Sequence, residues 1–199
     1  MIVGIEGPVL AGKSSLTRLL VDVLTATGVE CVACPCFVEV AKRLGRPIPP
    51  GLSRSADEQL RAMRFFVQID RLRRGPHIAE LTLLDRTTWT LEAHTHALLT
   101  MGAISDVDVD EPTRRAAREL RPDVLVYLDV PTEVQLERSS SRVALPPPFL
   151  DPAFNTAFRS YFEATAPEHR ALWLDATRPL QTSVASVVDY LRTTDSADG

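Results

Sequence analysis

The chain has 199 residues, of which 45% are hydrophobic and 24% are charged, and its formal net charge is −4. This is enough apolar material for one core of ordinary size, so a single domain is expected. The negative net charge argues against a general nucleic-acid-binding protein, which needs a basic surface. No apolar run has the length of a membrane span, and the first residues lack a secretory signal pattern. We therefore expect a cytoplasmic protein with neither nucleic acid nor membrane as a partner.

Five short apolar runs alternate with helical stretches along the chain. They are residues 2–6, 29–33, 81–85, 124–129 and 172–175. Continuous apolar runs are typical of parallel strands that helices cover on both faces, so the alternation predicts an α/β fold with a five-stranded, doubly wound parallel sheet in three layers. We expect one domain over residues 1–192 and a frayed polar tail over residues 193–199.

The segments between these runs carry helix signals. Apolar residues at three- and four-residue spacing predict a first helix from about Lys13 to Gly28, where glycine ends it. Ser55 and Glu58 have capping-box spacing, which predicts a long second helix that ends at Gly75. Further helices are expected over residues 87–100, 132–142, 151–164 and 183–192.

One motif carries a specific chemical meaning. Gly7, Gly12, Lys13 and Ser14 satisfy G-x-x-x-x-G-K-[ST] between an expected strand and an amphipathic helix, which is the context of a Walker A phosphate loop. Glycine permits the backbone to approach a polyphosphate closely, and the helix start adds a positive dipole end. Lys13 should then reach the β and γ phosphates, and the Ser14 hydroxyl should hold Mg²⁺. The expected nucleotide-binding residues are Gly7, Ala11, Gly12, Lys13, Ser14 and Ser15. An ordinary glycine-rich turn with a surface lysine does not explain this spacing.

The third apolar run ends in "LLDRTTWT", and its tip should lie beside the phosphate loop. Asp85 could orient Mg²⁺ or its waters, and Arg86 could point into the cleft. The alternative is an Asp-Arg ion pair that fixes the loop without touching a substrate. Trp89 could stack on a substrate or pack in the core.

A second basic element, "LERSSSR", precedes a proline-rich stretch at 144–151. Arg138 and Arg142 are four residues apart and would share one helix face. We expect a short lid over about 138–151, because phosphoryl transfer needs positive charge and exclusion of water at the reacting group. The alternative is a solvated helix face, which is our interpretation of the arginines in "PTRRAARELR".

Residues for a phosphoryl acceptor are harder to find. Glu39 follows the second apolar run and could accept the proton of a substrate hydroxyl, or it could be an exposed helix glutamate. Phe66, Gln68 and Arg71 lie on the expected second helix and could line an acceptor pocket, although core or surface positions are an alternative. The expected substrate-binding residues are Glu39, Phe66, Gln68, Arg71, Arg86 and Trp89, and the expected catalytic residues are Lys13, Glu39, Arg86, Arg138 and Arg142.

The cysteines and histidines form no recognisable catalytic or metal pattern. Cys31, Cys34 and Cys36 lie in one cluster, and no second Cys or His pair follows at zinc-ligand spacing, so we expect reduced thiols near a strand end. His94 and His96 should lie on different faces of one helix, which argues against a shared metal site.

Four stretches together resemble the thymidylate kinase and deoxynucleoside kinase group of P-loop kinases. "GIEGPVLAGKSSL" is similar to that group's phosphate loop, "FFVQIDR" to a helix segment of thymidylate kinases, and "LLDRTTWT" to the motif after the third strand. "VYLDVPTEVQLERSSSR" resembles the fourth strand and the arginine-bearing lid helix. The stretch "FVEVAKRLGRPIPP" departs from the group's usual Glu-Pro after the second strand.

The resemblance implies a bound Mg-ATP and transfer of its γ-phosphoryl group to a nucleoside or nucleoside monophosphate. By this resemblance Lys13, Ser14, Arg86, Arg138 and Arg142 act on phosphates, and Asp85 assists the metal. The implied partners are a nucleoside triphosphate and a small-molecule acceptor, with a second copy of the chain as a candidate. A kinase of another small hydroxyl compound and a regulatory NTPase are the alternatives, although the latter lacks a guanine-selecting Asn-Lys-x-Asp stretch.

Overall fold

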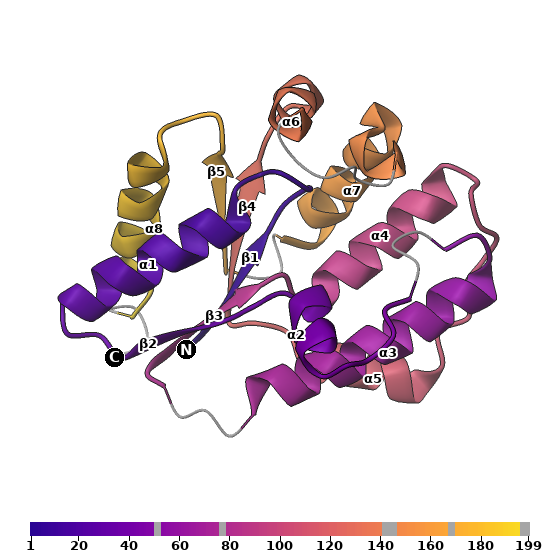
Figure 1. The fold of residues 1–199 in the computed structure, drawn as a ribbon, viewed down its shortest axis with the longest axis horizontal. Helices are drawn as coiled ribbons and strands as arrows, with labels where there is room; N and C mark the ends of the chain where they lie inside the picture. The colour runs from indigo at the N-terminus through magenta and orange to yellow at the C-terminus, as the bar shows by residue number, and fades with distance from the viewer. Residues whose placement is uncertain (50–52, 76–78, 141–146, 167–169, 196–199) are drawn as a thin grey trace.

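The computed structural model describes residues 1–49, 53–75, 79–140, 147–166 and 170–195. Five parallel strands form one sheet in the order β2-β3-β1-β4-β5 (Figure 1). The strands are β1 (Ile2–Glu6), β2 (Cys31–Cys34), β3 (Leu81–Asp85), β4 (Val124–Asp129) and β5 (Arg170–Asp175). The expected doubly wound parallel sheet is confirmed. The second strand begins two residues later than its apolar run, and the fifth begins two residues earlier and ends at the same residue.

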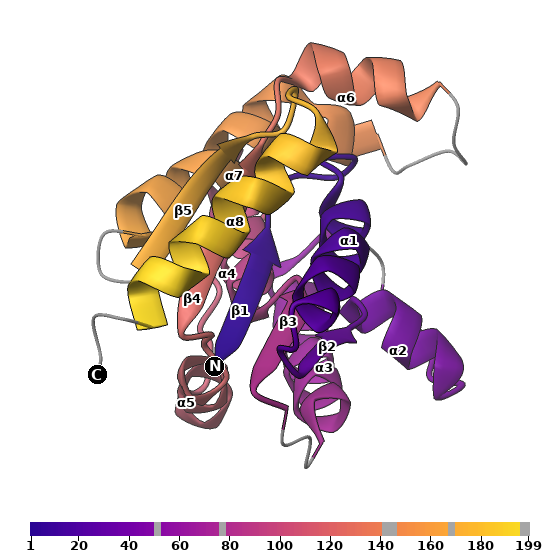
Figure 2. The same ribbon diagram turned by 90° about the vertical axis from the view of Figure 1, so that its left-hand side faces the viewer.

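Helices cover both faces of the sheet. They are α1 (Lys13–Ala26), α2 (Phe37–Arg43), α3 (Ala56–Arg74), α4 (Thr88–Thr100), α5 (Glu111–Glu119), α6 (Thr132–Ser139), α7 (Pro152–Thr165) and α8 (Leu180–Asp195), with a short 3₁₀ turn η1 (Pro147–Leu150). The α1 and α8 helices lie together on one face, and α4 and α7 lie together on the other, while α6 crosses above the carboxyl ends of the strands (Figure 2). No helix in these described ranges is long and apolar enough to cross a membrane.

Two apolar layers fix the sheet between the helices. In β4, Val124 and Val126 belong to the cluster with α1 and α8, whereas Leu125 and Tyr127 belong to the cluster with α4 and α7. This alternation follows from the two-residue period of a strand. Because both faces are buried, the strands contain continuous apolar runs, and the carboxyl ends of the sheet become a rigid support for loops.

The helix starts agree with the sequence signals. The α1 helix begins at Lys13, and the Ser55 side chain accepts a hydrogen bond from the Glu58 backbone N–H at 3.2 Å at the start of α3. Two short helices, α2 and α5, lie outside the segments for which we expected helices. The α8 helix continues to Asp195, so the chain is still helical where we expected a frayed tail to begin.

Candidate active site

The loop between β1 and α1 has a backbone that only glycine can supply at two positions. Gly7 has φ +132°, and a Cβ there would lie 2.4 Å from the backbone oxygen of Leu128. Gly12, at the entrance of α1, has φ +96°. A side chain at Gly7 would clash with the backbone of Leu128, and one at Gly12 would be strained by the positive φ. The positive end of the α1 dipole faces this turn.

The Lys13 side chain folds back over this loop. Its Nζ donates hydrogen bonds to the backbone oxygens of Gly7, at 3.0 Å, and Pro8, at 2.6 Å, and the residue is only 7% exposed. Burial, followed by the positive charge of Arg86, lowers the pKa of Lys13 to about 7, against the opposing charges of Asp85 and Glu6. An anion bound at this loop would favour the charged ammonium.

Ser14 and Asp85 meet from different elements, as expected for a shared metal. The Ser14 hydroxyl, in the first turn of α1, donates a hydrogen bond of 2.6 Å to the carboxylate of Asp85 at the end of β3. A hydroxyl and a carboxylate are the hard oxygen donors that Mg²⁺ prefers, and this ion usually completes its shell with waters and substrate phosphates. These two residues therefore fit the expected ion.

Arg86 follows directly and adopts an unusual backbone, with φ +67° for a residue that has a side chain. Its Nη1 is buried and has no hydrogen-bond partner among the described residues. Nearby Glu6 is fully buried and accepts hydrogen bonds from the backbone and hydroxyl of Thr87, at 2.6 and 2.7 Å. Burial raises the pKa of Glu6, against the hydrogen bonds from Thr90 and Thr87 and the charge of Arg86. The loop after β3 thus holds a guanidinium whose Nη1 is not used by another described residue.

Arg73 holds these strand ends in place, and the sequence analysis missed it. Its Nη1 donates to the backbone oxygens of Pro35, at 2.8 Å, and Asp85, at 3.0 Å, and its Nη2 donates to the backbone oxygen of Arg86. Its Nε donates to Asp70 at 2.6 Å. The i, i+3 spacing of Asp70 and Arg73 on a helix was the only sequence signal.

The acceptor residues expected on α3 do not come together with this loop. Gln68 and Arg71 are exposed, and the Arg71 guanidinium lies 3.6 Å from Glu119 of α5. Phe66 is half-buried, with its ring centroid 5.6 Å from that of Phe37 in α2. The inward positions of this part of the helix are taken by Ile69, Asp70 and Arg73, so Gln68 and Arg71 face outward.

Trp89 is packed in the core of the molecule. It is 1% exposed and belongs to the apolar cluster between α4 and α7. The guanidinium of Arg121 lies 5.6 Å from its ring centroid. This burial favours the core alternative for Trp89, while its contact with a substrate stays a prediction.

Glu39 lies at the rim of the candidate site. It is in α2, is about half exposed, and forms an ion pair with Arg43. Both residues line a cavity of about 350 Å³ that also contains Ser14 and Asp85. Its carboxylate is thus near the expected metal site, but it is tied to an arginine.

Arg138 of α6 reaches the phosphate loop. Its guanidinium donates to the backbone oxygens of Leu10, at 2.9 Å, and of Ala176 after β5, at 2.7 Å. It lines a cavity of about 400 Å³ together with Ala11, Gly12 and Ser15. The α6 helix ends at Ser139, and Arg142 lies outside the described residues, as does most of the expected lid.

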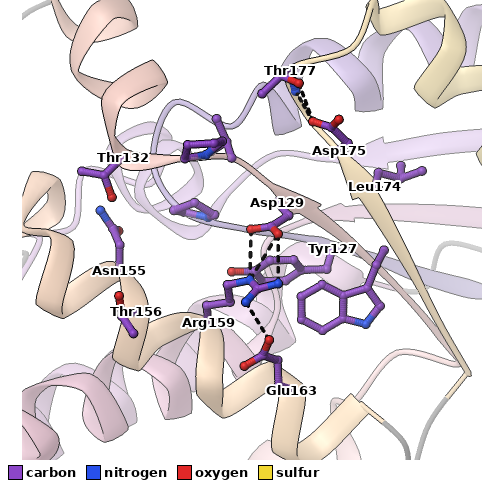
Figure 3. Close-up of a pocket in the computed structure, with 14 residues that line it drawn as sticks. Tyr127, Asp129, Thr132, Asn155, Thr156, Arg159, Glu163, Leu174, Asp175 and Thr177 are labelled. Atoms are coloured by element: carbon purple, nitrogen blue, oxygen red, sulfur yellow. Dashed lines mark hydrogen bonds and ion pairs between the residues drawn. The ribbon is translucent and has the colours of Figure 1, made fainter.

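A further cavity of about 700 Å³ lies between α6, α7, β4 and β5 (Figure 3). Arg159 bridges two carboxylates there, with its Nε 3.2 Å from Asp129 and its Nη1 2.7 Å from Glu163. Asp175 adds a third carboxylate and accepts hydrogen bonds from Thr177. Because carboxylates outnumber the arginine and the polar groups satisfy one another, this cavity is unsuited to a polyphosphate.

The cysteines lie at the two ends of β2 and just beyond it. Cys31 and Cys34 are buried, Cys36 is half-buried, and all three are free. Burial raises the pKa of Cys31 to about 11, which disfavours the reactive thiolate. Within the part of the chain that the structure describes, no group of three His, Cys, Asp or Glu side chains could hold a metal ion.

No protein-family model matches this sequence, and no curated protein is similar enough to be counted as a relative. Solved structures give a clearer answer. The chain is similar to a deoxyadenosine kinase from M. mycoides with bound dATP, with a TM-score of 0.66 and 16% identity over 96% of this chain and 99% of that chain. The same kinase with bound dCTP has a TM-score of 0.64 and 14% identity over 97% and 100%. The structure of that kinase with dCMP and dCDP bound has a TM-score of 0.63 and 15% identity over 97% of this chain and 100% of that chain. This chain therefore has the α/β fold of the P-loop deoxynucleoside kinases.

Proposed function

We propose that this protein is a kinase that transfers the γ-phosphoryl group of a nucleoside triphosphate, with ATP as the expected donor, to a hydroxyl group of a nucleoside. The observation that carries the proposal is the convergence of Lys13, Ser14, Asp85 and Arg86 at one end of the sheet, with Ser14 and Asp85 in direct contact at 2.6 Å. The structural similarity to a deoxyadenosine kinase that binds dATP and dCTP supports the same class of ligand.

The donor fits between the phosphate loop and α6. Its phosphates would lie on the backbone of Gly7 to Gly12 under Lys13, and its base would enter the cavity of about 400 Å³ beside Arg138. A planar guanidinium can stack on a base. Arg178 lines the same cavity and adds positive charge near the polyphosphate.

Charge neutralisation and positioning would supply most of the rate enhancement. The acceptor oxygen forms a bond to the γ-phosphorus while the bond from that phosphorus to the bridging oxygen breaks, and a nucleoside diphosphate leaves. Lys13 would stabilise the charge on the transferred group together with the Nη1 of Arg86, which has no hydrogen-bond partner within the described part of the chain. Ser14 and Asp85 would hold Mg²⁺, whose charge would offset that of the phosphates. Glu39 is our candidate to take the hydroxyl proton once a substrate displaces Arg43.

The cations of α3 favour an uncharged acceptor over a monophosphate. Arg73 and Arg74 are used by the buried carboxylate of Asp70, and Arg71 pairs with Glu119 on the outer surface. A nucleoside monophosphate brings about two negative charges. Arg64 of the same helix pairs with Asp110, so among the described residues exposed Arg61 is the α3 arginine that forms no ion pair. A monophosphate acceptor, as in thymidylate kinases, is therefore the second choice.

The chain contains only two lysines, and they make a matched pair for a test. Lys13→Ala should abolish transfer from ATP to nucleosides, because it removes the charge over the phosphate loop. Lys42→Ala, at an exposed position of α2, should leave transfer unchanged. Product formation would be followed by mass spectrometry, and wild-type rates in Lys13→Ala would contradict the proposal.

A further inference from the structure

His94 of α4 is a polar side chain in apolar surroundings. Its ring centroid lies 5.4, 5.6 and 5.3 Å from those of Phe149, Phe154 and Phe158. The residue is half-buried, and among the described residues neither ring nitrogen has a hydrogen-bond partner. The ring nitrogens of His94 are not among the buried side-chain nitrogens and oxygens that lack a partner, so the nitrogens of this half-buried ring are open to a ligand rather than used inside the protein.

The ring lies within reach of the charges of two candidate site residues, Arg86 and Lys13. Burial, followed by the positive charges of Arg86 and Lys13, lowers the pKa of His94 to about 3. The imidazole is therefore neutral near pH 7 and offers one N–H donor and one nitrogen acceptor. A neutral group of this kind suits an uncharged hydroxyl better than a phosphate.

His96, two residues further on, provides the contrast within the same helix. Its Nε2 lies 3.2 Å from the Ser160 hydroxyl of α7, and its ring centroid lies 5.9 Å from that of Tyr161. This histidine has a partner inside the protein and a clear structural role between α4 and α7.

We propose that His94 is a specificity-determining residue that hydrogen-bonds a sugar hydroxyl of the nucleoside acceptor, with the Phe149 ring beside it as part of the wall of the acceptor site. The proposal rests on the proposed function. The reacting hydroxyl must lie near Lys13 and Arg86, so the part of a nucleoside that comes next to them is its sugar. A hydroxyl of that sugar, other than the reacting one, would satisfy the imidazole.

The experiment compares nucleosides that lack single sugar hydroxyls. Wild type, His94→Phe and His96→Phe would be assayed with ATP and the nucleosides of the four common bases. Each nucleoside would be supplied as the ribonucleoside, as the 2′-deoxynucleoside and as the 3′-deoxynucleoside, so that each analogue lacks one sugar hydroxyl. In wild type, loss of one of these two hydroxyls should lower kcat/KM about tenfold, as for one lost hydrogen bond. In His94→Phe, kcat/KM for the parent should fall by a similar factor through the acceptor KM, and loss of the same hydroxyl should have no further effect.

The matched control, His96→Phe, should keep the sensitivity of wild type to the missing hydroxyl. Retained sensitivity in His94→Phe would overturn the role of His94 while leaving the kinase function intact. An absence of turnover with every nucleoside in wild type would instead overturn the proposed function, and this inference with it. Should His94→Phe fail to fold, ¹⁵N NMR of the wild-type imidazoles decides, because the accepted nucleoside should shift the His94 ring resonances, and unshifted resonances would overturn the proposal.

Discussion

Lys13, Arg86 and Glu6 are each held in an unfavourable state by the fold. Lys13 is buried with a pKa of about 7, Arg86 has a left-handed backbone, and Glu6 has no exposed surface. Costs of this kind gather where a protein prepares charges for a ligand. Hydrogen bonds to two backbone oxygens hold the Lys13 amine over the loop, and in the proposed function phosphates would replace them.

The shifted pKa of Lys13 makes nucleotide binding depend on pH. With a pKa of about 7, Lys13 in the free protein is largely neutral at pH 8, whereas bound phosphates would raise its pKa and protonate it. Because the complex binds more protons than the free protein, ATP affinity should fall as the pH rises above 7, by up to about tenfold per unit. Calorimetry at pH 8 in two buffers with different ionisation enthalpies should detect proton uptake in wild type. An affinity that stays constant between pH 6.5 and 8.5 would contradict this account.

At the scale of one element, α3 shows how a helix divides its arginines. Asp70 and Arg73 point inward and are 0% and 1% exposed in their side chains, whereas Arg71 points outward to Glu119. The sequence predicted the helix and both of its ends, yet it placed the functional arginine at Arg71. Residues along a helix are about 100° apart, so a difference of two positions exchanges the buried face for the exposed one. The inside arginine is set by contacts with segments that are remote in sequence, because Arg73 bonds to the backbone after β2 and at the end of β3.

Replacing Arg73 should therefore destabilise the protein far more than replacing Arg71. Arg73→Met leaves the buried Asp70 carboxylate with less compensation and frees three backbone oxygens, which should lower the free energy of unfolding by about 3–5 kcal/mol. Arg71→Met removes only an exposed ion pair and should change it by less than about 0.5 kcal/mol. Urea unfolding measures both variants, and equal losses would show that Arg73 does not clamp the strand ends.

At the scale of the whole molecule, the strand order builds the site. β1 is the central strand and pairs with β3 and β4, so the loops that follow all three meet at one edge of the sheet (Figure 1). This brings Lys13, Arg86 and Asp129 to one end of the molecule from distant parts of the chain. Ligands of open α/β sheets bind at that end.

Local signals explain how far the sequence could predict this architecture. The strands can be predicted from short apolar runs, and the loop after β1 from the spacing of Gly7, Gly12 and Lys13. The structure has a turn with positive φ at both glycines between β1 and α1. The seven-residue α2 and the polar α5 leave little apolar periodicity to detect. Arg73, Glu6 and His94 could not be found in this way, because their surroundings come from segments that are remote in sequence.

The central claim is tested most directly by the acceptor itself. The protein would be incubated with ATP, Mg²⁺ and, separately, nucleosides, nucleoside monophosphates, other hydroxyl metabolites or no acceptor, and phosphorylated products and ADP would be measured by mass spectrometry. The account predicts that ADP forms together with a nucleoside monophosphate when a nucleoside is present, and that little ADP forms without an acceptor. ADP production at the same rate with no acceptor would identify an NTPase and contradict it, and products from monophosphates alone would contradict the choice of acceptor.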